Sequence, residues 1–243
     1  EFDDFLQGGS GDDVIDGLGG NDNIAPGAGD DTVMGGEGND YISAGGPWNP
    51  GSDYIDGGEN EDDFDTVHYD YSSLTTGITF HATGAGGSQF DFHDGSTDTL
   101  VDIEWLNVSG GSGNDVLVGD EQMNSLEGNG GNDTLTGGVG SDSFNFRSDI
   151  ANGRDRITDF GPGDWLNFNN IEIYGPIQEG DDPSSLGLGE VMIGTPQNGI
   201  TTLYVRVAPG EAGLTIIDLQ GSFSRTNFNL NVNEWGTSLN YMA

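Results

Sequence analysis

The sequence predicts an all-β protein: a parallel β-roll solenoid in two blocks, with a β-hairpin insertion and a C-terminal antiparallel, β-sandwich-like cap. Three observations support this fold class. A glycine-rich period of nine residues runs through residues 8–68 and 110–145, residues 69–106 interrupt it, and aromatic and aliphatic strands follow residue 145. Such periods are typical of solenoids, whose repeats pack only on their neighbours. We therefore divide the chain into 1–68, 69–106, 107–145 and 146–243.

The repeat unit is clearest near the N-terminus, where residues 8–16 read GGSGDDVID and residues 17–25 read GLGGNDNIA. Glycines at the first, second and fourth places permit the tight turns of a six-residue loop. The last three places alternate polar, aliphatic and polar, as a short strand does. Two copies make one coil, and we expect the aliphatic residues to point inward: Ile15, Ile24, Val33, Ile42, Ile55, Val67, Leu117, Leu126, Leu135 and Phe144.

Negative charge is concentrated in the repeats. The 243 residues include 42 Asp and Glu against 5 Lys and Arg, a net charge of -37, and residues 1–145 hold 30 of the acids and none of the five arginines. This balance excludes nucleic acid and anionic membranes as electrostatic partners. One aliphatic residue in nine cannot stabilise a coil by apolar burial alone, and cysteine is absent. A chain of this composition stays disordered unless a multivalent cation supplies what the core lacks.

The sixth place of the repeat carries the candidate metal ligands. A hard cation such as Ca²⁺ takes about 6–8 oxygen ligands, which two stacked loops can offer as two carboxylates and several peptide carbonyls. Loops lie on the same side every second copy, so we expect 13 to pair with 31, 22 with 40, 31 with 53, 40 with 65, 115 with 133 and 124 with 142. This predicts about six calcium ions. The residues at this place are Asp13, Asp22, Asp31, Asp40, Asp53, Asp65, Asp115, Asn124, Asp133 and Asp142.

These copies resemble the Gly-Gly-x-Gly-x-Asp-x-aliphatic-x nonapeptide of RTX (haemolysin-type calcium-binding) proteins. The resemblance implies a β-roll with Ca²⁺ between its turns. Asn124 brings no charge, and the copy 57–68 lacks glycine at its fourth place, so these two sites are expected to be weak. The resemblance also implies carbonyl ligands at the second and fourth places of one loop and the first and third places of the next: Gly9, Gly11, Pro26, Ala28, Leu18, Gly20, Gly35, Glu37, Gly27, Gly29, Ala44, Gly46, Gly111, Gly113, Gly128, Gly130, Asp120, Gln122, Gly137 and Val139.

The segment 155–166, which reads DRITDFGPGDWL, resembles the stretch after the last repeat in the C-terminal domains of serralysin-type metalloproteases and other type I-secreted proteins. In that family, acids near this position complete a last calcium site. Asp149, Asp159 and Asp164 are therefore candidate ligands, with solvation of strand ends as their alternative role. Residues 202–219 are similar to the terminal sandwich of that group, and we expect a type I secretion signal within 146–243.

The resemblance implies a function in secretion. We expect a calcium-binding module that folds on extracellular Ca²⁺ and supports type I secretion and extracellular folding of a larger, bacterial parent protein. Its expected partners are calcium ions and the type I secretion machinery, without membrane insertion, and we expect a monomer. The chain begins without Met, which favours a piece of a longer protein.

Catalysis by this chain is not expected. The sequence has no His-Glu-x-x-His, no Gly-x-Ser-x-Gly, no cysteine and no lysine for a phosphate loop. The parent protein could still be a secreted hydrolase. An alternative function is an extracellular carbohydrate- or surface-binding module of an adhesin or polysaccharide-modifying enzyme, in which Trp48 would stack on a sugar. Packing of Trp48 against the roll is the simpler interpretation.

Overall fold

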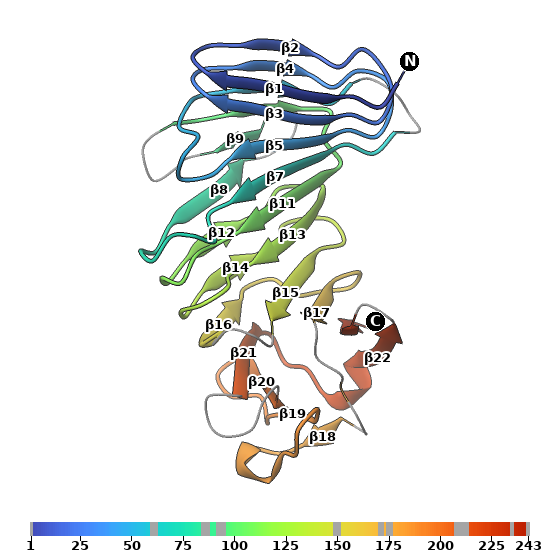
Figure 1. The fold of residues 1–243 in the computed structure, drawn as a ribbon. Helices are drawn as coiled ribbons and strands as arrows, with labels where there is room; N and C mark the ends of the chain where they lie inside the picture. Colours follow the sequence, from blue (N-terminus) through green and yellow to red (C-terminus); the bar gives the residue numbers. More distant parts are fainter. Residues whose placement is uncertain are drawn as a thin grey trace.

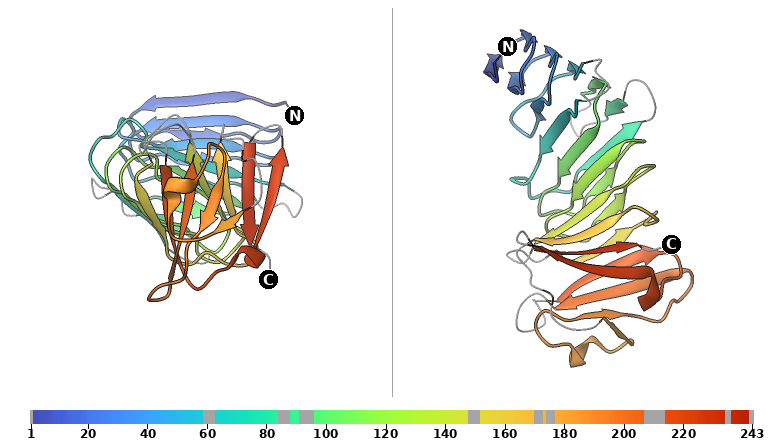
Figure 2. Two further views of the ribbon diagram at one scale, coloured as in Figure 1. Left: turned by 90° about the horizontal axis from the view of Figure 1, so that it is seen from below. Right: turned by 90° about the vertical axis from the view of Figure 1, so that its right-hand side faces the viewer.

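The computed structural model describes residues 2–58, 63–83, 88–90, 96–147, 152–169, 173, 177–206, 214–233 and 236–241. It is all-β, as predicted, with short 3-10 turns at Pro183–Ser185 and Arg225–Asn227. The chain winds between two sheets, and in the repeats each pair of successive strands makes one coil (Figure 1). Figure 2 shows the coils stacked from the N-terminal end to the cap.

The first sheet runs from the N-terminal coil into the cap. Its roll strands pair in parallel, with residue 5 opposite residue 23 and residue 23 opposite residue 41. Its order is β1 (Phe5–Ser10), β3 (Asn23–Ala28), β5 (Tyr41–Gly45), β7 (Thr66–Asp70), β11 (Trp105–Ser109), β13 (Met123–Glu127), β15 (Ser143–Arg147), β17 (Trp165–Asn169), β23 (Gly236–Tyr241) and β22 (Phe228–Asn233).

The second sheet faces the first across the core. Its repeat strands are three residues long and are the last three residues of each copy, of which the middle one faces inward. Its order is β2 (Val14–Asp16), β4 (Thr32–Met34), β6 (Tyr54–Asp56), β10 (Thr99–Val101), β9 (Ser88–Phe90), β8 (Thr79–Thr83), β12 (Val116–Val118), β14 (Thr134–Thr136), β16 (Arg154–Ile157), β21 (Leu214–Gln220), β20 (Ile200–Arg206), β19 (Val191–Ile193) and β18 (Gln178–Glu179).

The predicted inward residues form the core. Nine of the ten aliphatic or aromatic positions are at most 1% exposed, and Ile15, in the first coil, is partly buried against them. Side chains alternate across a strand, so the neighbouring polar positions face outward. The core is therefore one narrow column of apolar residues between the two sheets.

The interruption of the period does not interrupt the roll. β11 pairs in parallel with β7, and β10 pairs in parallel with β6, so residues 99–109 form a further coil. The expected hairpin is present between β8 and β9, which pair antiparallel, while β8 also pairs with β12. Residues 99–106 thus belong to the solenoid rather than to the insertion. The nine-residue spacing is lost there, although the alternation in the two strands is kept.

The cap continues both sheets. β21 lies parallel to β16, β20 lies antiparallel to β21, and β23 lies antiparallel to β17. Four aromatic rings pack at this end with centroids 5.7–6.2 Å apart, those of Phe160, Phe223, Phe228 and Tyr241. The cap thereby covers the last coil with apolar side chains. Within the described part of the chain, no helix has the length and apolar character needed to span a membrane.

Candidate metal centre

The strands of the roll have a polar side chain at or next to their start, except β8, which follows the apolar Ile78. Parallel stacking brings these side chains into two rows, one along each edge of the roll. The row beside the first sheet is Asp4, Asp22, Asp40, Asp65, Glu104, Asn124, Asp142 and Asp164, and the row beside the second sheet is Asp13, Asp31, Asp53, Asp98, Asp115, Asp133 and Asp155. Each row is interrupted at the insertion, where Asn124 lies opposite Leu106 instead of Glu104 and β9 and β8 separate Asp98 from Asp115.

The six predicted pairs lie next to each other in these rows. In each pair the backbone N–H of the earlier residue donates to Oδ1 of the later one. The distances are 2.8 Å for 13 to 31, 22 to 40, 40 to 65 and 115 to 133, 2.9 Å for 31 to 53, and 3.0 Å for 124 to 142. One carboxylate oxygen of each later residue is thus fixed by the backbone of the loop before it.

The other carboxylate oxygen is often without a partner. Burying a carboxylate oxygen without a hydrogen bond is costly, because nothing replaces the water that it loses. Among the described residues, this oxygen is buried and makes no hydrogen bond in six aspartates of the two rows: Asp13, Asp22, Asp31, Asp40, Asp65 and Asp133. These unpartnered oxygens call for a positive ligand.

Main-chain carbonyls converge on the same points, and glycine keeps the space open. A Cβ on Gly17 would collide with the free oxygen of Asp22 and with the carbonyl oxygen of Gly35. Gly8 has the same relation to Asp13 and Pro26. Carboxylate and carbonyl oxygens are the ligands that Ca²⁺ prefers. The residues present therefore fit the metal that the repeat implies.

The carbonyls expected at the second and fourth places stack over glycines of the next loop on the same side. A Cβ on those glycines would strike the carbonyl below it: Gly27 on Gly9, Gly29 on Gly11, Gly36 on Leu18, Gly38 on Gly20, Gly131 on Gly113, Gly138 on Asp120 and Gly140 on Gln122. Several candidate carbonyls also accept a backbone hydrogen bond, such as Ala28 from Gly11 at 2.6 Å and Glu37 from Gly20 at 2.8 Å. A carbonyl has two lone pairs, so each keeps one for another ligand.

One pair of expected carbonyl ligands lies elsewhere. Ala44 belongs to β5 and, with Gly46, lines a cavity of about 230 Å³ instead of a six-residue loop. The four residues of Pro47–Pro50 that lengthen this copy carry the chain away from the regular loop path. The copy with the insertion therefore departs from the geometry of its neighbours.

Burial and mutual repulsion raise the pKa values of several acids in the rows. Burial raises the pKa of Asp53, Asp65 and Asp133 to about 7, and nearby carboxylates add to this effect. Burial likewise raises the pKa of Asp155 to about 8 and that of Asp142 to about 6. The charged forms are disfavoured because burial removes their hydration and neighbouring carboxylates repel them.

Two predicted pairs are closed by the protein itself. The side-chain amide of Asn124 donates to the carbonyls of Gln122 and Gly137, at 2.9 and 3.1 Å, and to Oδ1 of Asp142 at 3.0 Å. This amide takes the place of a cation among three oxygens. In the other pair, the second oxygen of Asp115 accepts the N–H of Gly111 at 2.8 Å. The space between the two loops of each of these pairs therefore differs from the spaces that contain an unpartnered carboxylate oxygen. We call each such space between stacked loops a gap.

The C-terminal candidates have different positions. Asp164 continues the row, accepting from the Asp142 N–H at 3.0 Å and from the Gly161 N–H at 2.7 Å. Both oxygens of Asp159 accept backbone N–H groups, from Gly137 and Gly138 at 3.0 and 2.8 Å. Asp159 thus closes a repeat loop through protein hydrogen bonds. Asp149 lies outside the described residues.

Sequence reasoning missed four acids of the rows: Asp4, Asp98, Glu104 and Asp155. Asp98 and Glu104 bind the backbone N–H groups of Asp53 and Asp65, both at 2.8 Å. None of the four lies in a complete nonapeptide. An acid directly before a polar–aliphatic–polar triplet, as in Asp98-Thr99-Leu100-Val101, was the available signal.

A second ladder at the fifth place was also missed. Here the later loop donates and the earlier side chain accepts, as from the Asp30 N–H to Asp12 Oδ1 at 3.0 Å and from the Asn132 N–H to Asn114 Oδ1 at 2.9 Å. The two ladders run in opposite directions between the same loops. The fifth-place bonds need no metal, and they hold the loops in register.

No group of three or more His, Cys, Asp or Glu side chains that could hold a metal occurs in the described ranges. The candidate sites depend on at most two acids each, so main-chain oxygens and water must complete the coordination. This is the arrangement that the repeat pattern predicts.

One family model agrees with the repeat. The family model of the RTX calcium-binding nonapeptide repeat matches residues 1–33, 26–46 and 109–144. No curated protein matches the chain. Among solved structures, the chain is similar to the extracellular lipase LipA from Serratia marcescens, with 18% identity and a TM-score of 0.31. The match covers 86% of this chain but only 39% of the lipase, so the chain spans well under half of that protein's length.

Proposed function

We propose that this chain, which carries RTX calcium-binding nonapeptide repeats on a β-roll, is a module of a secreted protein that folds on binding extracellular Ca²⁺. The observation that carries the proposal is the set of six buried, unpartnered carboxylate oxygens, which recur at one place of the repeat. Buried charges are retained in proteins when a metal or a partner compensates them.

The side chains of the rows would hold the ions, and the glycines would leave room for them. Ca²⁺, when bound, supplies two positive charges and six to eight coordination positions. The aspartates offer one oxygen each toward the following loop, and first-place carbonyls such as those of Pro26 and Gly35 offer another. Without compensation, the -30 of residues 1–145 favours an expanded chain.

The magnitude suffices for a folding switch. A ligand at ten times its dissociation constant stabilises the folded state by about 1.4 kcal/mol per site, so about six sites contribute roughly 8 kcal/mol. This is comparable to the stability of an entire domain, about 5–15 kcal/mol. In a low-calcium cytosol the chain would stay unfolded, as passage through a type I exporter requires, and it would fold outside. The module itself is non-catalytic in this proposal and serves a larger parent protein.

Far-UV circular dichroism tests the switch. The full chain is expected to lose its β spectrum when a chelator removes calcium and to regain it on addition of Ca²⁺. Mg²⁺ is the control, because it demands octahedral geometry and keeps its waters. A β spectrum that is unchanged by the chelator would sink the proposal.

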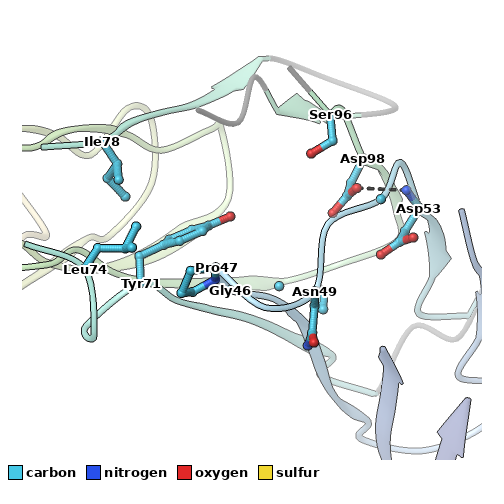
Figure 3. Close-up of a pocket in the computed structure, with 12 residues that line it drawn as sticks. Gly46, Pro47, Asn49, Asp53, Tyr71, Leu74, Ile78, Ser96 and Asp98 are labelled. Carbon is cyan, nitrogen blue, oxygen red and sulfur yellow. Dashed lines mark hydrogen bonds between the residues drawn. The ribbon is translucent and has the colours of Figure 1, made fainter. Parts of the chain in front are cut away.

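A second candidate function is binding to an extracellular carbohydrate or surface. The expectation that Trp48 packs on the roll is wrong, since its side chain is 81% exposed. Its neighbours Pro47 and Asn49 line the cavity of about 230 Å³ (Figure 3). Tyr71, Leu74 and Ile78 line one end of this cavity, and the carboxylates of Asp53 and Asp98 lie at the other (Figure 3).

An exposed aromatic ring beside a cavity with hydrogen-bonding groups suits a sugar. The two carboxylates make an anionic polymer an unfavourable ligand and leave a neutral glycan. A glycan panel should show binding that Trp48→Ala abolishes and that Leu188→Ala, another exposed apolar residue, leaves intact. Equal binding by both variants would exclude this function for Trp48.

A further inference from the structure

The junction between the two repeat blocks contains an arrangement that no repeat predicts. Asp65 is the last sixth-place aspartate of the first block, and it is fully buried. The next loop on its side is not a repeat but the short segment Asp102–Glu104, directly before β11. Both the N–H and the carbonyl of Asp65 make hydrogen bonds at the end of this segment. Its N–H donates to Oε2 of Glu104 at 2.8 Å, and its carbonyl accepts the Glu104 and Trp105 N–H groups at 3.2 and 3.0 Å.

Glu104 occupies the register position of a sixth-place aspartate. Trp105, which follows it, pairs with Thr66, and Thr66 pairs with Tyr41. Asp40 and Asp65 stand one residue before those strands, as Glu104 does. The hydrogen bond from the Asp65 N–H to Glu104 matches the bond from the Asp40 N–H to Asp65, also 2.8 Å.

The carbonyl of Asp102 occupies the position of a first-place carbonyl. A Cβ on Gly57 would collide with this oxygen and would lie 2.5 Å from the free oxygen of Asp65. Gly35 has the same relation to Asp40 and to the Gly57 carbonyl, inside the repeats. Asp102 adopts a left-handed backbone with φ of 50°, which turns the short segment within two residues.

The free oxygen of Asp65 is one of the six that are buried without a hydrogen bond. Glu104, Asp40 and Asp63 add repulsion to the effect of burial, and all three raise the pKa of Asp65. The other edge of the same coil differs, because both oxygens of Asp98 accept protein hydrogen bonds, from the Asp53 N–H and from the Tyr69 hydroxyl at 2.8 and 2.7 Å. The unsatisfied acid at this coil therefore lies on the Glu104 side.

We propose that Asp65, Glu104 and the Asp102 carbonyl form a calcium site that joins the two repeat blocks. This inference rests on the proposed function. The non-repeat segment supplies two of the three protein ligands, and water completes the coordination. An ion here is held by the first block and by the non-repeat coil 99–109, whose strand β11 pairs with β13 of the second block. The two blocks therefore fold and unfold as one calcium-dependent unit rather than as two.

The test compares the number of bound calcium ions in the full chain and in two variants, by titration against a chromophoric chelator. Glu104→Gln removes the charge but keeps an oxygen that can accept the Asp65 N–H, so the fold is preserved. Asp102→Asn is the matched control, because it removes one charge, tolerates the left-handed backbone and leaves the carbonyl in place. We expect Glu104→Gln to bind one ion fewer than the parent and Asp102→Asn to bind the same number.

Terbium luminescence supplies a second readout. Trp105 is adjacent to Glu104 and packs edge-on against Phe64 at 5.7 Å, so its indole should sensitise Tb³⁺ bound at this site. Trp105→Phe should therefore lower sensitised emission in the parent background but not in the Glu104→Gln background.

Two results would overturn the junction site: equal ion counts in the parent and Glu104→Gln, or an equal loss of emission in both backgrounds. A parent chain that binds no calcium would instead overturn the proposed function itself. The failure of the junction site is thus distinguishable from the failure of the proposed function.

Discussion

The substitution Asn124→Asp should create a calcium site where the parent protein uses an amide. In the parent, the two N–H groups of the amide are shared among three acceptor oxygens that lie 2.9–3.1 Å from the nitrogen. A carboxylate places an oxygen there, which cannot donate and which repels the carboxylate of Asp142. The change therefore converts a satisfied gap into one like those around the unpartnered aspartates.

Two contributions of opposite sign determine the stability of the variant, and only one of them depends on calcium. A net hydrogen bond contributes about 0.5–1.5 kcal/mol, so losing the two that the amide can donate costs about 1–3 kcal/mol at a calcium concentration just sufficient to fold the parent. At 100 times its dissociation constant, the additional ion returns about 2.7 kcal/mol. The variant should therefore be clearly less stable than the parent at low calcium and close to it at saturating calcium.

Urea unfolding at the two calcium concentrations, together with a count of bound ions, measures both effects. Asn114→Asp is the matched control, because this fifth-place side chain accepts a hydrogen bond from the Asn132 N–H, which a carboxylate also does. It should bind no additional ion. The reasoning is refuted if Asn124→Asp binds the same number of ions as the parent, or if its stability relative to the parent does not depend on calcium.

Two other perturbations address the glycine cradle and the raised pKa values. Gly17→Ala should weaken calcium binding, because its Cβ would collide with two of the oxygens at that site. Gly161→Ala is the control and should leave calcium binding unchanged, because its Cβ would lie 3.5 Å from the nearest atom. Calcium titration of the two variants distinguishes these outcomes. For pH, burial raises the pKa of Asp53, Asp65 and Asp133 to about 7 in the folded state, above the ordinary value of 3.8. The metal-free folded chain then binds more protons than the unfolded chain between these values, so its stability is greatest at acid pH and is lost as the pH rises through about 7. Circular dichroism in chelator should show β structure appearing on acidification, and a spectrum that does not change between pH 7 and pH 4 would contradict this.

The core and the row positions could be predicted because both depend on local spacing. An aliphatic residue every nine positions faces inward whenever the strands stack in register, and nine of the ten predicted positions are buried. The same spacing puts the sixth-place residues side by side. Glu104 and Asp155 could not be found in this way, because they enter the rows through strand pairing across segments that have lost the repeat.

The sequence also could not predict which carboxylate oxygens between stacked loops have a hydrogen-bond partner. Asp115 and Asp133 occupy the same place of the repeat, yet the second oxygen of Asp115 accepts the Gly111 N–H and that of Asp133 has no partner. Oδ1 of Asp115 accepts the Ile78 N–H from the segment before β8, whereas Oδ1 of Asp133 accepts the Asp115 N–H from the preceding repeat coil. One neighbour of Asp115 thus comes from a segment outside the repeat, which the period does not place.

The sequence by itself determined the fold class, the calcium-binding repeat and the residues at each loop, because a periodic solenoid repeats the same local geometry. Only the tertiary structure decided which acids are left unpartnered, that the two blocks form one continuous roll, and that Trp48 is exposed. The physical reason is that a hydrogen bond to a buried oxygen depends on which coil lies above it. Across an insertion, strand pairing and not the nine-residue period decides which coil lies above a given loop.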